Sequence, residues 1–489
     1  MSPIIQLFLY PVSPVLALWL AACLLVVLEF FPRLPLGRVK SGIAIGASVL
    51  SLFFTYSLWK SGVASGVALS NAEAKWLVEF GLSYRLDHLA LSFYAGIALF
   101  TTLGLVFMQR SFHDHPVHGE ILMLVLFAAS GMMLLVSADS LLMAFLGLEM
   151  MSLPTYVLVG IRRTDRESTE AALKYFLFGS FASVLFVFGI ALLYGQFGTI
   201  RISTLAQMVG AIHGDAVANP ILLLGGMALL TVAAAFKVGV VPFHMWVPDV
   251  YQGAPASITG FMGAAIKMAG FGLVLRFFWE MFLPISAQWM PIIHWLAILA
   301  MFVGNIAALA QDNLKRLFAY SSISHAGYLF VGLTAAAAGG SASPTIGPIF
   351  YYLVVYGFMF LGLLACLALL EDSTGSTEIH QLSGLGFTHP VLGACIAVFA
   401  LSAAGIPPTA GFFGKYFMFL EAVRAGNVML VVLAVISSCI GAYFYLRVLV
   451  YLYMKDAKEK LVLNLRPGLT FAGIILCALS LFLFAAVPF

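Results

Sequence analysis

Fourteen apolar stretches, each long enough to cross a membrane as a helix, constrain this chain more than any other feature of its sequence. About 20 apolar residues are needed to cross the roughly 30 Å of hydrocarbon in a bilayer, and helices satisfy their own backbone hydrogen bonds there. We therefore predict an all-α polytopic membrane protein with about 14 transmembrane helices. Their expected positions are residues 13–31, 41–60, 87–109, 118–137, 139–160, 167–195, 220–241, 256–280, 289–310, 313–337, 346–370, 389–425, 427–454 and 467–488.

The amino-acid composition supports a membrane environment. Hydrophobic residues make up 62% of the chain and charged residues only 9%, whereas about 25% of the residues of a soluble domain are charged. The ten-residue alternation of an outer-membrane barrel does not occur. No Lys or Arg precedes Arg33, so the basic start of a signal peptide is missing, and we expect residues 1–31 to be retained.

The basic residues of the loops predict the orientation. When successive loops are assigned to alternate sides, thirteen Lys and Arg residues fall on one side and five on the other. Basic loops stay in the cytoplasm during insertion, so we predict that both termini lie outside it. The same residues are scattered over many loops, which argues against a nucleic-acid partner. Residues 61–84 and 371–388 are the longest predicted polar links.

Motifs for cofactors and metal ions do not occur in the sequence. The five cysteines lie far apart inside predicted helices, without the paired spacings of zinc or iron-sulfur ligation. Phosphate-binding and dinucleotide-binding motifs are missing, so NADH, flavin and ATP have no predicted site in this chain. The stretch His113-Asp114-His115-Pro116-Val117-His118 has metal-binding residue types, but its proline and short irregular loop favour a solvated turn.

Six ionisable residues lie where hydrocarbon is expected. A charge at the bilayer centre costs about 2.5 kcal/mol or more, so such residues usually line a wet or protein-shielded pathway. The alternative for each is a structural residue that is paired with a neighbour or reaches the interface, and we favour that alternative for Arg276 and Arg447, near helix ends. The six are Glu149, Lys174, Lys237, Lys267, His325 and Lys415.

Three of the lysines are the strongest candidates for proton transfer. Lys237, Lys267 and Lys415 are predicted at mid-depth, where Glu149 is the one carboxylate expected at a matching depth. Burial disfavours the charged form of an amine, and this property allows a buried lysine to release and rebind a proton. We therefore interpret these three lysines as a proton relay rather than as packing residues.

Glu149 and Lys174 have opposite charges on consecutive predicted helices, and we expect them to pair. Contact would keep both ionised, whereas separation would leave Lys174 to repel protons from nearby lysines. A static salt bridge is the alternative. His244 and His325, as histidines with pKa values near neutrality, are interpreted either as proton relays or as hydrogen-bonded packing residues.

Two predicted helices are interrupted. Pro242 and Pro248 interrupt the seventh, and Gly405, Pro407 and Pro408 interrupt the twelfth. Proline removes a backbone donor and frees carbonyl groups, and such breaks at corresponding places in two halves indicate an inverted-repeat transporter core. We predict four parts: helices 1–3 in residues 1–117, a first repeat of helices 4–8 in 118–282, a second repeat of helices 9–13 in 283–454, and helix 14 in 455–489.

Three segments show a family resemblance. They are Lys237–Pro255, which reads K-V-G-V-V-P-F-H-M-W-V-P-D-V-Y-Q-G-A-P, then Lys315–Tyr328 and Ala404–Lys415. Together with the helix count, they make the chain resemble the antiporter-like subunit N family of bacterial NADH:quinone oxidoreductase, or complex I, over nearly its whole length. The sister subunit M differs by a glutamate where this chain has Lys415, and subunit L is longer.

The resemblance implies roles for the charged residues. Glu149 and Lys174 would be a modulating pair, Lys237 the central proton site, Lys267 a bridge, and Lys415 the site toward the second half-channel. It also implies a multi-pass protein of the bacterial inner membrane whose partners are other membrane-arm subunits, with FMN, iron-sulfur clusters and the quinone site in those other subunits.

Three alternatives remain open from the sequence. A subunit of a multisubunit cation/proton antiporter would share the lysines and broken helices. A membrane-bound hydrogenase arm is a related variant. A purely structural membrane subunit would tolerate neutral residues at all five positions Glu149, Lys174, Lys237, Lys267 and Lys415.

Overall fold

The computed structural model describes residues 3–30, 37–61, 84–113, 115–211, 220–338, 346–456 and 468–486, with side chains from Val12 onward. Within these ranges the chain is built from helices joined by turns, and the β-structure consists of three isolated bridges. Twelve helices in the described ranges are long and apolar enough to cross a membrane. The prediction of an all-α polytopic membrane protein is therefore confirmed.

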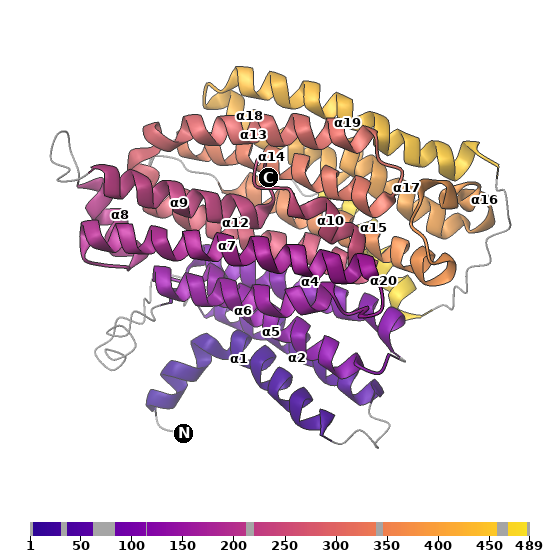
Figure 1. Cartoon of the computed structure of the whole chain (residues 1–489), viewed down its shortest axis with the longest axis horizontal. Coiled ribbons are helices and arrows are strands. Elements are labelled where there is room, and N and C mark those ends of the chain that lie inside the picture. The colour runs from indigo at the N-terminus through magenta and orange to yellow at the C-terminus, as the bar shows by residue number, and fades with distance from the viewer. Residues whose placement is uncertain are drawn as a thin grey trace. The chain divides into compact units, whose positions relative to one another are not determined.

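The chain divides into two compact units, whose helices are labelled in Figure 1. The first unit contains residues 1–158, 176–237 and 265–285, and the second contains residues 159–175, 238–264 and 286–489. The long helix α7 (Arg166–Phe197) is divided between the units after Tyr175. Each unit is described by itself below.

In the first unit, α1, α2, α4 and α5 pack against one another, and α12 packs on α4 and α5. Close packing uses small residues: a Cβ on Gly131 of α5 would lie 2.5 Å from the backbone nitrogen of Met151 in α6. The elements are α1 (Pro3–Glu29), α2 (Gly37–Lys60), α4 (His88–Phe112), α5 (His118–Val136), α6 (Leu141–Val159), most of α7, α8 (Ile202–Gly210), α9 (Pro220–Val238), α12 (Lys267–Leu275), the π-helical turn η5 (Arg276–Met281) and η6 (Leu283–Ile285).

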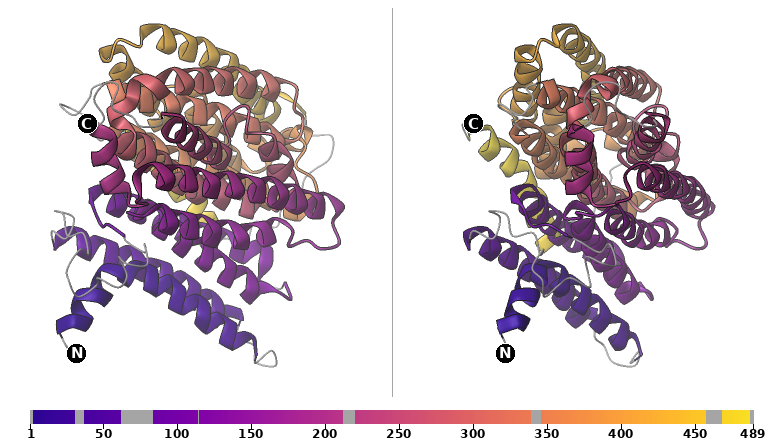
Figure 2. Two further views of the ribbon diagram at one scale, coloured as in Figure 1. Left: turned by 60° about the vertical axis from the view of Figure 1, so that its left-hand side comes forward. Right: turned by 90° about the vertical axis from the view of Figure 1, so that its left-hand side faces the viewer.

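In the second unit, α13 packs along α14 and α19, and α15 packs on α11, α17, α18 and α20. Figure 2 shows these helices from two further sides. The elements are α10 (Trp246–Gly253), α11 (Ala256–Phe261), η4 (Met262–Ile266), α13 (Ser286–Leu309), α14 (Leu314–Ala338), α15 (Gly347–Thr374), η8 (Ile379–Leu382), α16 (Leu385–Thr388), α17 (Pro390–Ala404), α18 (Ala410–Arg424), α19 (Val428–Met454), α20 (Leu469–Leu483) and η9 (Phe484–Ala486).

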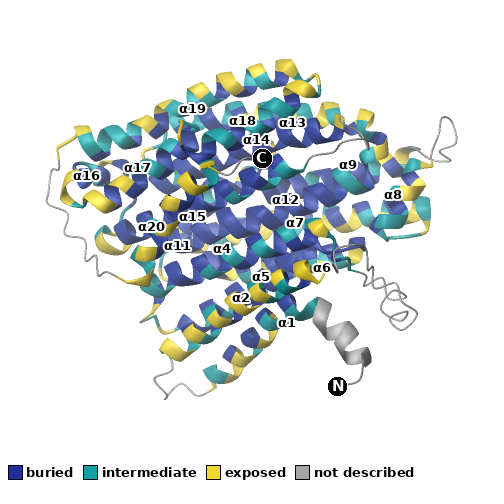
Figure 3. Ribbon diagram, turned by 180° about the vertical axis from the view of Figure 1, so that it is seen from behind, coloured by how far each residue is buried: buried dark blue, intermediate teal, exposed yellow. Residues whose placement is uncertain are grey.

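Burial separates the inner helices from those that expose apolar side chains (Figure 3). The apolar part of α15 is fully buried. By contrast, α7 exposes large apolar side chains such as Phe181 and Val184, each 64% exposed, and α19 exposes Val432 and Tyr443. Exposed apolar surface of this extent is stable against hydrocarbon but not against water, which agrees with a membrane location.

One hydrogen-bonded turn occurs twice, once in each unit. In both places the first residue of a helix, Leu141 of α6 or Leu314 of α14, donates its backbone N–H to the carbonyl of a residue far away in the sequence. The residue two positions after that acceptor then donates its own N–H to the carbonyl two positions before the helix start. The four bonds are Leu141 N to Ile200 O at 2.9 Å, Ile202 N to Asp139 O at 2.8 Å, Leu314 N to Thr377 O at 2.8 Å, and Ile379 N to Asp312 O at 2.8 Å.

A second local structure also occurs twice. α9 ends at Val238 and is followed by Gly239 with φ +74°, and α17 ends at Ala404 and is followed by Gly405 with φ +82°. Glycine adopts this left-handed conformation without the penalty that a Cβ would impose, and it commonly ends helices. A proline follows each glycine by three residues, and a new helix, α10 or α18, begins soon after.

Candidate functional site

Lys237 lies in the last turn of α9 with only 5% of its surface exposed. Its Nζ donates a hydrogen bond of 2.8 Å to Oγ of Ser152 on α6. The same serine hydroxyl donates to the carbonyl of Leu148 one turn earlier, which fixes its direction. A buried ammonium needs acceptors for its protons, and this hydroxyl supplies one.

Lys415 occupies a polar socket made by a helix end. Its Nζ donates to the carbonyl oxygens of Ala403 and Ala404 and to Oγ of Ser438, each at 3.0 Å. The last carbonyls of a helix lack intrahelical partners, so the end of α17 provides acceptors for a cation. The ring of Tyr328 lies 5.0 Å from Nζ, which is within the range of a cation–π contact.

A cavity of about 540 Å³ opens beside the Lys415 socket. Most of its walls are apolar and come from α18 and α19, including Phe412, Phe419 and Val435, while Lys415 and Ser438 supply polar atoms. The ammonium therefore lies at the edge of an apolar space rather than inside closely packed protein.

His325 is the centre of a buried polar network in the second unit. Its Nδ1 lies 2.5 Å from the hydroxyl of Tyr352, and its Nε2 lies 2.9 Å from the hydroxyl of Tyr445. The Tyr445 hydroxyl is also hydrogen-bonded to Ser321 at 2.5 Å. Hydroxyls and an imidazole can both donate and accept protons, so this chain of contacts has the chemistry of a proton relay.

The remaining predicted residues differ in their surroundings. Glu149, in α6, accepts a short hydrogen bond from the hydroxyl of Ser183 on α7. Lys267 begins α12 and is 4% exposed. His244 is half-buried in the turn between α9 and α10.

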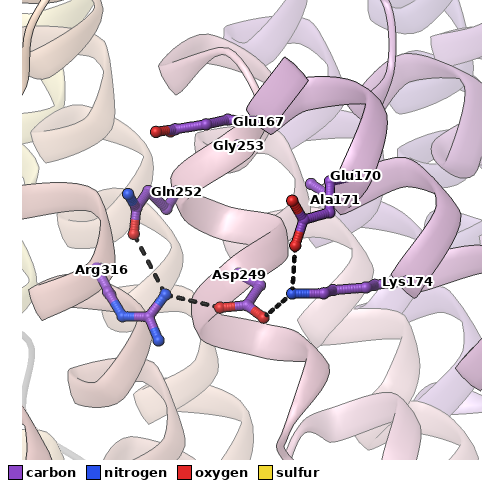
Figure 4. Close-up of a pocket in the computed structure, with 8 residues that line it drawn as sticks. All are labelled: Glu167, Glu170, Ala171, Lys174, Asp249, Gln252, Gly253 and Arg316. Atoms are coloured by element: carbon purple, nitrogen blue, oxygen red, sulfur yellow. Dashed lines mark hydrogen bonds and ion pairs between the residues drawn. The ribbon is translucent and has the colours of Figure 1, made fainter. Parts of the chain in front are cut away.

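Lys174 forms ion pairs with carboxylates that the sequence reasoning did not consider (Figure 4). Its Nζ lies 2.7 Å from Oδ2 of Asp249 on α10 and 2.8 Å from Oε1 of Glu170, one turn earlier on α7. Nη1 of Arg316, on α14, lies 2.7 Å from the other oxygen of Asp249 and 3.2 Å from Oε1 of Gln252. These side chains line a polar cavity of about 190 Å³.

The predicted Glu149–Lys174 pair involves both units, because Glu149 belongs to the first and Lys174 to the second. Glu149 has a serine partner and Lys174 has carboxylate partners within their own units. The pairing of the two with each other stays a prediction.

A buried charge cluster in the second unit centres on Glu371. Lys315 Nζ lies 2.7 Å and Arg162 Nη1 3.0 Å from its Oε1, and the backbone N–H of Ala256, at the start of α11, donates to its Oε2 at 2.9 Å. Lys315 also donates to the carbonyl of Ala254 at 2.9 Å. The prediction that residues 371–388 form a polar link is wrong at its start, because α15 continues through Thr374 and Glu371 is buried.

Arg276 and Arg447 have structural surroundings. The fully buried Arg276 donates from Nη1 and Nη2 to the two oxygens of Asp87 at 2.6 and 2.8 Å, and its Nε donates to the carbonyl of Val136 at 2.9 Å. Arg447 donates to the carbonyl of Leu309 at 3.3 Å. Val136 and Leu309 are the last residues of α5 and α13, so the two arginines occupy corresponding places.

The structure adds residues that sequence reasoning missed. Ser152, Ser183 and Ser438 are hydrogen-bond partners of predicted site residues, but a serine inside an apolar helix carries no signal that separates it from the others. Asp249 and Arg316 could have been found, because both lie inside the segments that carried the family resemblance.

In the histidine-rich stretch that we interpreted as a solvated turn, Asp114 lies outside the described residues. His118 is hydrogen-bonded through Nε2 to Oγ of Ser41 at 2.9 Å. In the part of the chain that the structure describes, no group of three His, Cys, Asp or Glu residues is placed to hold a metal ion.

The chain is similar to known proteins over most of its length. Residues 138–441 match the family described as NADH:quinone oxidoreductase/Mrp antiporter, TM. The relative named NADH-quinone oxidoreductase subunit N 1 from Koribacter versatilis (strain Ellin345) is 39% identical over 467 residues, which cover 90% of each protein. NADH-quinone oxidoreductase subunit N from Bdellovibrio bacteriovorus is 37% identical over 458 residues, covering 92% of this chain and 90% of that protein.

Solved structures show the same fold. A chain of respiratory complex I from Thermus thermophilus with bound aureothin has a TM-score of 0.77 and 30% identity, with 96% of each chain covered. A chain of the Mrp complex from Dietzia sp. DQ12-45-1b has a TM-score of 0.81 and 20% identity, covering 99% of this chain and 95% of that one. At that lower identity, the second likeness concerns the fold alone.

Proposed function

Because the chain belongs to the family of NADH-quinone oxidoreductase subunit N, we propose that it is a non-redox, proton-translocating subunit in the membrane arm of that enzyme complex. Electron transfer from NADH to quinone takes place in other subunits, which carry FMN, the iron-sulfur clusters and the quinone site. The partners of this chain are the neighbouring membrane-arm subunits and the lipid of the bacterial inner membrane.

The observation that carries the proposal is the pair of polar sockets that hold buried lysines. Lys237 donates to a serine hydroxyl, and Lys415 donates to helix-end carbonyls and a second serine. Neutral acceptors stabilise an ammonium less than a carboxylate would, so Lys415 can lose its proton without breaking an ion pair among its described contacts. That property suits a group that must load and release protons.

We assign fourteen spans to the chain. To the twelve long apolar helices we add α14 as the thirteenth span and α17 with α18 as one discontinuous fourteenth span. The helix α9 is already one of the twelve, and we treat it with α10 as a second discontinuous span. The first repeat is then residues 118–282 and the second 283–454. The turn that occurs in both units and the glycine-ended helices α9 and α17 support this division. Both termini lie outside the cytoplasm in this topology.

The proposed pathway uses the charged residues in the roles that the family implies. Glu149 with Lys174 modulates the relay, Lys237 is the central site, Lys267 bridges the halves, and Lys415 serves the second half-channel. His325, between Tyr352 and Tyr445, connects groups of the second half, and His244 lies next to the interruption after α9.

Energy for this transport must come from the rest of the complex. Moving one charge against 100 mV costs about 2.3 kcal/mol. We propose that quinone reduction changes the charge distribution near Glu149, that Lys174 responds, and that a proton leaves the lysine row to the outside. Protons from the cytoplasm then reload the lysines.

A direct test uses the whole complex purified through a tag on this chain. With Lys415→Ala, we expect NADH oxidation by an artificial acceptor to persist while proton uptake into proteoliposomes driven by quinone reduction falls at least several-fold. Unchanged pumping would contradict the proposal. Sodium/proton antiport by the isolated chain would instead favour the antiporter alternative.

A further inference from the structure

Asp249 joins two cations from two different helices. Its Oδ2 accepts from Lys174 of α7 and its Oδ1 accepts from Arg316 of α14, both at 2.7 Å. Each carboxylate oxygen therefore has a partner of its own. If Lys174 left, Asp249 would still be paired with Arg316 and would not become an isolated charge.

The pair between Lys174 and Asp249 is partly exposed. Their side chains are 38% and 30% exposed, so solvent screens the attraction between them. The neighbouring pair of Lys315 and Glu371 is different, because both side chains are less than 10% exposed and breaking a buried pair is costly. Separating the buried pair between α14 and α15 therefore costs more than separating the partly exposed pair of Lys174 and Asp249.

The place of Asp249 in the chain is the second observation. It is the tenth residue after Gly239, the left-handed glycine that ends α9. Lys415 is likewise the tenth residue after Gly405, the left-handed glycine that ends α17. The first repeat therefore has an aspartate at the position where the second repeat has its functional lysine.

Contacts from α14 hold the rest of α10 in place. Lys315 donates to the carbonyl of Ala254, directly after α10, and Arg316 donates to Gln252 within it. Lys174 is thus attached, through Asp249, to the short helix that follows the interruption after Lys237. A movement of the Lys174 side chain would therefore be transmitted to α10 through its ion pair with Asp249, without involving Glu149.

We propose that Asp249 is a positioning residue that ties the Lys174 ammonium to α10, so that a change at Lys174 is transmitted to the short helix that follows Lys237. The inference rests on the proposed function, which gives Lys174 its modulating role. The structure contains the Asp249-bound arrangement, with Glu170 as a further partner of the same ammonium.

The test measures the reactivity of the Lys174 amine directly. In the intact complex, a water-soluble amine-acylating reagent is applied and the modified fraction of Lys174 is followed over time by mass spectrometry. Asp249→Asn removes the acceptor charge, so we expect acylation of Lys174 to become several-fold faster. Glu167→Gln is the matched control, because Glu167 lines the same cavity and has no hydrogen bond or ion pair with Lys174 among the described contacts.

Pumping by the same variants completes the test. We expect Asp249→Asn to lower the number of protons pumped per electron, Asp249→Glu to restore it, and Glu167→Gln to leave it unchanged. Lys174 reactivity that does not respond to Asp249→Asn would overturn the inference, whether or not the Lys415 test of the proposed function succeeds. If the complex with Asp249→Asn does not assemble, acylation of Lys174 is measured in the complex with Arg316→Gln instead. Loss of the competing cation should slow acylation of Lys174, and faster or unchanged acylation would overturn the inference.

Discussion

The ammonium of Lys237 and the hydroxyl of Ser152 are joined by a hydrogen bond of 2.8 Å between helices α9 and α6, within one compact unit of the chain. The contact ties a buried amine to a neutral acceptor. Its strength is that of a hydrogen bond to a charged group, enough to position the lysine without fixing its charge.

Removing this hydroxyl should impair pumping. Ser152→Ala leaves a buried donor with a lost partner, which disfavours the protonated amine by about 1–3 kcal/mol, and about 1.4 kcal/mol corresponds to a tenfold change in the equilibrium between its two protonation states. We expect quinone-driven proton pumping to fall roughly tenfold. Thr155→Val is the control, because it removes a hydroxyl from the same helix that bonds only to the backbone of Met151 among the described contacts. Equal losses in both variants would contradict the role of Ser152.

Replacing Gly405 by a residue with a side chain should be harmful for two reasons. Its φ of +82° disfavours a side chain, and an added Cβ would lie 3.0 Å from Cδ and 3.2 Å from Nζ of Lys415. Gly426 has a similar φ of +84° but open space around it. Both Gly→Ala variants should lose about 1–2 kcal/mol of stability from the backbone conformation, whereas only Gly405→Ala should reduce pumping by displacing the Lys415 ammonium. Pumping assays and thermal unfolding of the purified complex measure the two effects separately.

The buried cluster around Glu371 should contribute to stability. Glu371→Gln leaves Lys315 and Arg162 without their carboxylate, and the loss of one partner of a buried pair costs about 3–5 kcal/mol. Glu421→Gln breaks a solvent-exposed pair with Arg424 and should cost about 0–1 kcal/mol. Thermal unfolding of the two variants in detergent compares them. Similar melting temperatures would show that the buried cluster contributes no more to stability than the exposed pair does.

Asp87 should make stability depend on pH. Burial opposes its ionised form, but Arg276, the N–H of Ala90 and Arg85 together hold the pKa of Asp87 below its ordinary value of 3.8. A lowered carboxylate pKa contributes stability that is present above the ordinary value and is lost as the pH falls through the lowered one. Asp87→Ser keeps a helix-capping oxygen but removes the charge. The variant should be less stable than the parent at pH 7, and the difference should shrink in acid; a constant difference would argue against the ionic contribution.

Helix positions were predictable because hydrocarbon imposes a simple rule on sequence. The apolar runs 167–195 and 427–454 correspond to Arg166–Phe197 and Val428–Met454 in the structure, since polar residues mark both ends. The run 389–425 contains two helices, α17 and α18, and its composition indicated the interruption at Gly405. The π-helical turns η4 and η5 within residues 256–281 had no such signal.

Partners of the charged residues were harder to predict, because they depend on the contacts between helices. The sequence predicts one carboxylate, Glu149, at the depth of the lysines. Asp249 was overlooked as a partner of Lys174, because it follows an interruption and its depth cannot be counted from a continuous helix. The serine partners Ser152 and Ser438 are short neutral side chains that only the packing of α6 and α19 identifies.

Proton pumping by the assembled complex with Lys237→Ala is the sharpest test of Lys237 as a proton-transfer site. The number of protons translocated per NADH oxidised is measured in proteoliposomes, and oxidation of NADH by an artificial acceptor verifies assembly. We expect artificial-acceptor activity to be retained while protons translocated per NADH decrease or coupled turnover nearly stops. A variant that assembles and pumps the same number of protons per NADH at the normal rate would exclude this role for Lys237.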